Sequence, residues 1–356
     1  MTDSTAGTKL RMEAFMKLIA LPFLVATATA CTTSVSLDSN ADAPPDAVVD
    51  GVEAAPEVGT PDVTASEVGT PDITASEVGA PDADSGGPSI TVAEGDTVIP
   101  QTVLHLSATW VDGGGPSEIA WSVDQPVGSQ SVFQPSADVA SPRFEANVAG
   151  TYTFHAQMRS HTGESYQRSF MVFVAPTDAI HVELLWHTPN DPNETNVGPV
   201  AGADLDLHFA HPQASSQDVD GDGQPDPWFD NQFDCFWFNP NPNWAGFDDA
   251  VDDDPALDRD DTDGAGPENL NLAEPEVGAC YRVGVHYWSD HAFGPSIATV
   301  RIYILGELAY ESPATTLARH DLWRVGRVCW VGGDATIEAD GAITADYVHP
   351  MFAGED

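Results

Sequence analysis

Short runs of apolar residues, separated by clusters of Gly, Pro and Ser, recur from residue 88 onward and predict β-strands. In residues 88–176 no helical period of similar length competes with them. The expected strands there are residues 89–92, 103–110, 119–123, 143–146, 150–158 and 169–174. In residues 178–356 they are 181–186, 205–210, 281–288, 298–305, 323–331 and 335–339. The pattern predicts an all-β protein with two β-sandwich domains, the second carrying two long insertions.

Residues 1–30 have the pattern of a signal peptide. Three basic residues, Lys9, Arg11 and Lys17, precede an apolar run at residues 18–30. This run matches the h-region of a secretory signal and is too short to span a bilayer as a helix. We therefore expect the rest of the chain to be exported and soluble.

A cysteine, Cys31, follows the small residues at 28–30. This arrangement resembles a bacterial lipobox, in which the cysteine becomes the lipidated first residue of the mature chain. Ala28 stands where the lipobox usually has Leu, so cleavage after Ala30 that leaves a free Cys31 is the alternative. Thr32 stands where an Asp would indicate retention in the inner membrane. The resemblance implies an outer-membrane lipoprotein anchored at Cys31, facing the cell surface or the periplasm.

Residues 31–87 are rich in Asp, Ala, Pro, Ser and Thr and contain no aromatic residue. A ten-residue repeat lies within them, beginning at Pro56, Ser66 and Ser76. The period is too short for repeats that bury a core, and its Pro and acidic residues favour an extended chain. We expect a disordered stalk.

The charge of the chain is strongly negative, with 56 Asp and Glu against 12 Lys and Arg and a net charge of -44. Nucleic acid is excluded as an expected partner, because phosphate binding needs clustered cations. The carboxylates either keep the chain soluble by repulsion or collect divalent cations.

Trp121 and Tyr152 carry a family resemblance in the first domain. The segments EIAWSVDQPVGS and VAGTYTFHAQM are similar to those of PKD-type or related immunoglobulin-like domains. The resemblance implies that Trp121 lies in the core and that Tyr152, after Gly150, forms a tyrosine corner. It implies a spacer or binding module without catalysis.

Four segments of the second domain resemble a bacterial secreted domain of uncharacterised function. They are VELLWHTP, ADLDLHFAHP, DDTDGAGPENLNL and YRVGVHYW, within residues 179–312. The resemblance implies that the D-L-D-L-H strand lies beside the acidic segment. It implies no reaction.

Residues 218–226 form the sharpest chemical motif, with alternate carboxylates and a turn-forming glycine at the sixth position. Such a spacing directs oxygens inward around a calcium ion. The twelfth position is Phe229 rather than the usual bidentate Glu, and prolines interrupt the exit. The motif is more like helix-free extracellular calcium loops, and a solvated acidic turn is the alternative. The expected ligands are Asp218, Asp220, Asp222 and Asp226.

A second set of carboxylates lies in the D-L-D-L-H strand and the following acidic segment. Asp204 and Asp206 alternate with leucines, so both acids project from one face of a strand. Four carboxylates within six residues of the acidic segment repel one another unless a cation offsets them. We expect a shared calcium site, and a hydrated acidic loop is the alternative. The expected ligands are Asp204, Asp206, Asp258, Asp260, Asp261, Asp263 and Glu268.

Aromatic residues cluster between these two acidic sets. Trp237 and Trp244 are candidates for a platform that stacks on sugar or peptide, and a small satellite core is the favoured interpretation. Export should oxidise one pair among Cys235, Cys280 and Cys329, and the sequence does not choose the pair.

The motifs of hydrolases, zinc proteases and nucleotide-binding enzymes are missing from the sequence. The favoured function is a non-catalytic, calcium-stabilised lipoprotein that displays β-sandwich modules for adhesion to a glycan or protein. The alternative is a secreted hydrolase or carbohydrate-processing protein with a site near Asp204 and Asp260.

Overall fold

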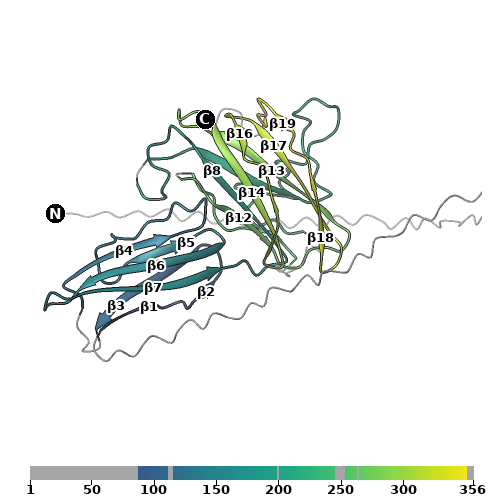
Figure 1. Ribbon diagram of the computed structural model, residues 1–356. Helices are drawn as coiled ribbons and strands as arrows, with labels where there is room; N and C mark the ends of the chain where they lie inside the picture. Colours follow the sequence, from purple (N-terminus) through teal and green to yellow (C-terminus); the bar gives the residue numbers. More distant parts are fainter. Residues whose placement is uncertain (1–86, 111–114, 199, 245–252, 263, 351–356) are drawn as a thin grey trace, which may run out of the picture. The chain divides into compact units, whose positions relative to one another are not determined.

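A computed structural model describes residues 87–110, 115–198, 200–244, 253–262 and 264–350. The expected signal peptide, Cys31 and the repeats of the stalk lie outside these residues. Every regular element in the described part is a β-strand, which confirms the predicted all-β fold class (Figure 1). No helix within the described ranges is long and apolar enough to cross a bilayer.

Seven strands form the first sandwich. They are β1 (Pro88–Val92), β2 (Thr97–Val98), β3 (Thr102–Trp110), β4 (Glu118–Asp124), β5 (Arg143–Ala146), β6 (Gly150–Arg159) and β7 (Ser165–Val174). One sheet has the order β1-β3-β5 and the other β2-β7-β6-β4. All pairs are antiparallel except β2 with β7. Alternate residues of these strands point into one core between the sheets.

Trp121 and Tyr152 lie in that core, 4% and 0% exposed. The Tyr152 hydroxyl donates to the carbonyl of Val148 at 3.1 Å and accepts from the Val148 N–H at 3.0 Å. A tyrosine hydroxyl bonded to the backbone a few residues upstream is a tyrosine corner. The packing expected of both aromatics is therefore present in the first sandwich.

Twelve strands form the second sandwich. They are β8 (Ile180–His187), β9 (Asp204–Ala210), β10 (Asp234–Cys235), β11 (Ala256–Leu257), β12 (Glu268–Leu272), β13 (Cys280–Ser289), β14 (Ser296–Ile304), β15 (Glu307–Glu311), β16 (Thr315–Leu317), β17 (Leu322–Trp330), β18 (Ala335–Ala339) and β19 (Ile343–Thr344). One sheet has the order β10-β9-β13-β17-β18, with β19 on β17. The other has the order β11-β12-β8-β14-β15, with β16 on β14.

The outer face of the sheet that contains β9 is covered by the insertion after β9. Trp228, Phe229 and Phe236 of this insertion form a second small core with Tyr347. Gly284 of β13 allows this packing, because a side chain there would lie 2.7 Å from the Trp228 ring. The insertion thus has a core of its own, as the favoured interpretation of its aromatic residues predicts.

A disulfide joins Cys280 of β13 to Cys329 of β17, which are paired across the two strands. Cys235 is a free thiol and is fully buried. The structure thereby chooses one of the three pairings that the sequence leaves open.

Candidate metal centre

Asp204 and Asp206 lie at the start of β9, where this strand is an edge of its sheet. Leu205 and Leu207 between and after them are 0% exposed and point into the main core. The two acids therefore share the opposite face, as the alternation predicts. β10 pairs with β9 only at Ala210 and Phe209, so no strand of the described residues pairs with β9 on this side beside the two acids.

Glu268, the first residue of β12, reaches this edge from the other sheet. Its carboxylate accepts hydrogen bonds from the Leu207 N–H at 2.6 Å and from the Asp261 N–H at 3.2 Å. The preceding segment is held against β8, since the Trp186 N–H donates to the carbonyl of Ala265 at 3.0 Å. One buried carboxylate thus joins β9, β12 and the acidic segment.

Asp204, Asp206 and Asp260 each place a carboxylate oxygen within 4.8 Å of those of the other two. Asp204 and Asp206 are 8% and 2% exposed, whereas Asp260 lies at the surface. Asp204 Oδ1 and Asp206 Oδ2 are buried and have no hydrogen-bond partner among the described residues. The closest base to Asp206 is His286, whose Nδ1 lies 3.9 Å from Oδ2. Two buried carboxyl oxygens thus accept no hydrogen bond from the described residues, and their ionised form is costly unless a cation binds them.

The electrostatics of the cluster follow from burial and from mutual repulsion. Burial, with the charges of Asp260 and Asp261, raises the pKa of Asp204 to about 7. Burial and the neighbouring carboxylates also raise the pKa of Asp206 and of Glu268 well above their ordinary values. At an effective dielectric constant of about 20, two carboxylates this close repel by roughly 3 kcal/mol. Without a cation the cluster must therefore hold protons or strain the fold.

The donor set fits a hard divalent cation. Every candidate ligand atom is a carboxylate oxygen, which suits calcium with its six to eight oxygen ligands and flexible geometry. Asp204, Asp206 and Asp260 would hold the ion. Glu268, which already accepts two backbone hydrogen bonds, closes the buried side of the cluster.

The structure corrects one member of the predicted ligand set. Asp258 does not join the cluster, because its carboxylate accepts a hydrogen bond from the Asn271 side chain. Glu268 is the first residue of β12. Asp261 lies close to the cluster. Its N–H donates to Glu268, and its carboxylate accepts a hydrogen bond from Asn196 Nδ2 at 2.8 Å. Asp263 lies outside the described residues.

The loop at residues 218–226 brings together Asp218, Asp220 and Asp222, each with one oxygen within 4.8 Å of the others. All three are partly or fully exposed. Their oxygens also accept backbone hydrogen bonds, as from the Gly221 N–H to Asp218 at 2.8 Å. Asp226 is buried and turned to the protein: its Oδ2 accepts from the Val219 N–H and the Tyr347 hydroxyl, at 2.8 and 2.9 Å.

The predicted platform is wrong for Trp244. This side chain is 1% exposed and stacks on Tyr281 and Phe209 in the main core, so no ligand can reach its face. Trp237 is half-buried and packs edge-on against Trp288.

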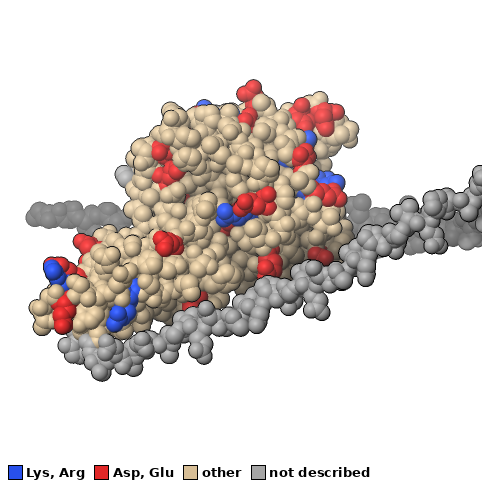
Figure 2. Space-filling view, in the orientation of Figure 1, with Lys and Arg blue, Asp and Glu red and all other residues tan. Residues whose placement is uncertain are grey.

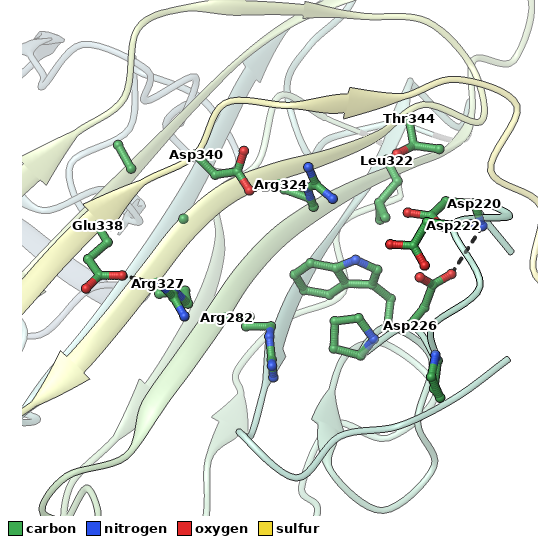
Figure 3. Close-up of a pocket in the computed structure, with 15 residues that line it drawn as sticks. Asp220, Asp222, Asp226, Arg282, Leu322, Arg324, Arg327, Glu338, Asp340 and Thr344 are labelled. Carbon is green, nitrogen blue, oxygen red and sulfur yellow. Dashed lines mark hydrogen bonds and ion pairs between the residues drawn. The ribbon is translucent and has the colours of Figure 1, made fainter. Parts of the chain in front are cut away.

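Sequence reasoning missed a cavity of about 570 Å³ on the outer face of the sheet that contains β9, β13, β17 and β18 (Figure 3). Arg282, Arg324 and Arg327 line it, and the loop with Asp220 and Asp222 forms one of its walls. The scarcity of arginine in so acidic a chain is the signal that could have directed attention to these residues.

Comparisons with known proteins give little beyond this geometry. No protein-family model matches the chain, and no curated protein matches it. Among solved structures, extracellular cadherin domains 3–6 of protocadherin gamma B2 are similar at 11% sequence identity and a TM-score of 0.20. That match covers 57% of this chain and 46% of the other, so the chain spans less than half of that structure's length. A similarity this weak carries no information about function.

Proposed function

We propose that the protein is an exported, non-catalytic display protein whose second β-sandwich is stabilised by calcium at Asp204, Asp206 and Asp260. The observation that carries this proposal is the pair of buried oxygens, Asp204 Oδ1 and Asp206 Oδ2, that accept no hydrogen bond from the described residues. A cation between them would offset both the burial and the repulsion that raise their pKa values. Because the cluster joins β9 to β12, the ion would fasten one sheet of the sandwich to the other.

The surroundings of the cluster support an ion site rather than a substrate cleft. Three surface cavities of the described residues have none of Asp204, Asp206, Asp260 or Glu268 in their walls. A glycosidase needs two carboxylates facing each other across a cleft that admits a sugar ring. Here the two buried acids project side by side from one strand.

The loop at Asp218, Asp220 and Asp222 is proposed as a second calcium site, because its three carboxylates converge. Within this proposal, lipidation at Cys31 anchors the chain to the outer membrane, and the acidic stalk carries the sandwiches away from it. The sandwiches then display a surface for a glycan or protein partner. On the face in Figure 2, red carboxylates form scattered patches on a mostly uncharged surface and outnumber the blue Lys and Arg groups.

Calorimetric titration of the full chain with calcium, after treatment with chelator, tests the proposal. We expect two bound ions in the wild type, one in Asp206→Asn and one in Asp220→Asn. Asp258→Asn is the matched control and should keep both, since Asp258 is bonded to Asn271 outside the cluster. Absence of calcium binding, or an unchanged ion count in Asp206→Asn, would overturn the proposal.

A further inference from the structure

Arginine is scarce in this protein, and its placement is therefore informative. The whole chain has 12 Lys and Arg against 56 Asp and Glu. Three of these arginines nevertheless line a single cavity: Arg282 of β13 with Arg324 and Arg327 of β17. Arg282 and Arg327 are direct partners across the two strands, so two like charges lie side by side.

Arg282 differs from the other two in its partners. Arg324 pairs with Asp340 at 3.2 Å, and Arg327 pairs with Glu338, both from the neighbouring β18 region. Within the described ranges Arg282 has no carboxylate at ion-pair distance, and its one hydrogen bond goes to the carbonyl of His211 at 3.3 Å. Burial and the charge of Arg327 lower the pKa of Arg282. Arg282 is thus a half-buried guanidinium beside a second guanidinium, in a chain that is rich in carboxylates. Such a group is suited to binding an external anion.

The cavity has the size of a small-ligand site, at about 570 Å³. Its walls come from the insertion after β9 and from β13, β17, β18 and β19. Figure 3 shows Arg282 near Arg327 and Arg324, with Glu338 beside Arg327 and Asp340 beside Arg324. The floor includes Trp228, which packs on the bare backbone of Gly284.

The lining selects the chemistry of the ligand. One guanidinium without a carboxylate partner binds one carboxylate, bidentately where the geometry allows. Of the five carboxylates that line the cavity, those of Asp220 and Asp222 belong to the proposed second calcium site, and those of Glu338 and Asp340 would repel a second negative charge. They accept hydrogen bonds, as does the hydroxyl of Thr344, so they suit a ligand rich in hydroxyl groups. A single carboxylate among several hydroxyls describes a uronic acid.

We propose that this cavity binds an acidic sugar of the uronate type, with Arg282 contacting the sugar carboxylate. The site goes beyond the calcium proposal. It does not depend on Asp204 or Asp206, and it shares one wall, the loop with Asp220 and Asp222, with the proposed second calcium site. It gives the display protein a defined ligand class at a defined face of its second sandwich.

The test is calorimetric binding of galacturonate, which carries one carboxylate, to the full chain in excess calcium, compared with neutral galactose and with acetate. We expect galacturonate to bind and both other probes to bind at least about tenfold more weakly. Arg282→Gln should weaken galacturonate binding about tenfold or more, since a charge-assisted hydrogen bond is worth about 1.5–3 kcal/mol. Arg159→Gln, which removes an exposed arginine of the first sandwich, is the matched control and should change nothing.

Failure to bind galacturonate, equal binding of galactose, or unchanged binding by a folded Arg282→Gln would overturn the proposal. Equal binding of acetate would overturn the sugar assignment. If Arg282→Gln does not fold, Arg282→Lys keeps the charge but loses the planar fork, and it should still weaken binding. Calcium titration of the same samples reports separately on Asp204 and Asp206, so the two proposals can fail independently.

Discussion

The carboxylate of Glu268 on β12 accepts a 2.6 Å hydrogen bond from the backbone N–H of Leu207 on β9. This contact joins the two sheets of the second sandwich at the free edge of β9. It also places a third buried carboxylate beside Asp204 and Asp206, because the same side chain contacts the acidic segment through the Asp261 N–H. Glu268 therefore both links the two sheets and belongs to the carboxylate cluster.

Glu268→Gln separates these two roles. The amide keeps an oxygen for the Leu207 N–H, loses the acceptor for the Asp261 N–H and removes one negative charge from the cluster. In chelator we expect the stability to change little, because the lower repulsion offsets the lost hydrogen bond. In excess calcium we expect a smaller rise in melting temperature than in the wild type. Asp258→Asn is the control, and a full calcium response in Glu268→Gln would argue against a role for Glu268.

The pH dependence of stability without calcium follows from Asp204. Its pKa is raised from 3.8 to about 7, so between about pH 4 and pH 7 the folded state holds a proton that the unfolded state has lost. Stability in chelator should therefore fall as the pH rises through this window, by about 1.4 kcal/mol per unit of pKa shift.

Urea unfolding at a series of pH values, with chelator or with calcium, measures this effect. Calcium should oppose the fall, because it binds the ionised form. Asp204→Asn should flatten the curve in chelator. A wild-type stability that rises between pH 4 and pH 7 in chelator would contradict the assigned repulsion.

Tyr347, near the end of the described residues, forms a hydrogen bond to the loop at residues 218–226. Its hydroxyl donates to Asp226 Oδ2 at 2.9 Å in a buried position. Tyr347→Phe should lower the free energy of unfolding by about 1–2 kcal/mol, measured by urea unfolding, because the buried carboxylate loses a donor. Tyr310→Phe is the control with little expected change, since the Tyr310 hydroxyl has no hydrogen bond within the described residues. Equal effects of the two variants would contradict the role of Tyr347.

The three cysteines of the second sandwich should react differently. Replacing both Cys280 and Cys329 by Ser should lower the free energy of unfolding by up to about 4 kcal/mol, since the disulfide closes a long loop of the unfolded chain. Burial raises the pKa of the Cys235 thiol well above its ordinary value. Mass spectrometry after alkylation should find Cys235 unlabelled in the native protein and labelled after unfolding. Labelling of Cys280 without reduction would contradict the pairing.

The alternation of Asp204 and Asp206 with two leucines predicted both the strand and the shared face, because period two is a local property of the sequence. The position of Glu268 could not be predicted in this way. The segment that contains it is short, follows a proline and is rich in Asn, which are weak signals for a strand. Its pairing with β8 comes from tertiary contacts across distant segments.

Tertiary contacts also explain the other features of the structure that the sequence did not predict. The burial of Trp244 depends on Tyr281 and Phe209, which come from two other strands. The cavity around Arg282 is assembled from β13, β17, β18 and a loop before β10, so no single stretch of sequence contains it. Cys280 and Cys329 could be identified as the disulfide pair only from the register of β13 and β17.

The melting temperature of the wild type and of Asp206→Asn, each in excess calcium and in chelator, tests the central claim most directly. At calcium about 100 times the Kd, binding to the folded state contributes about 2.7 kcal/mol, which corresponds to a rise of several degrees. We predict that rise for the wild type. For Asp206→Asn we predict a smaller rise and a higher melting temperature than the wild type in chelator. A wild type that melts at one temperature in both conditions, or an Asp206→Asn variant with the full rise, would contradict a calcium site at Asp204, Asp206 and Asp260.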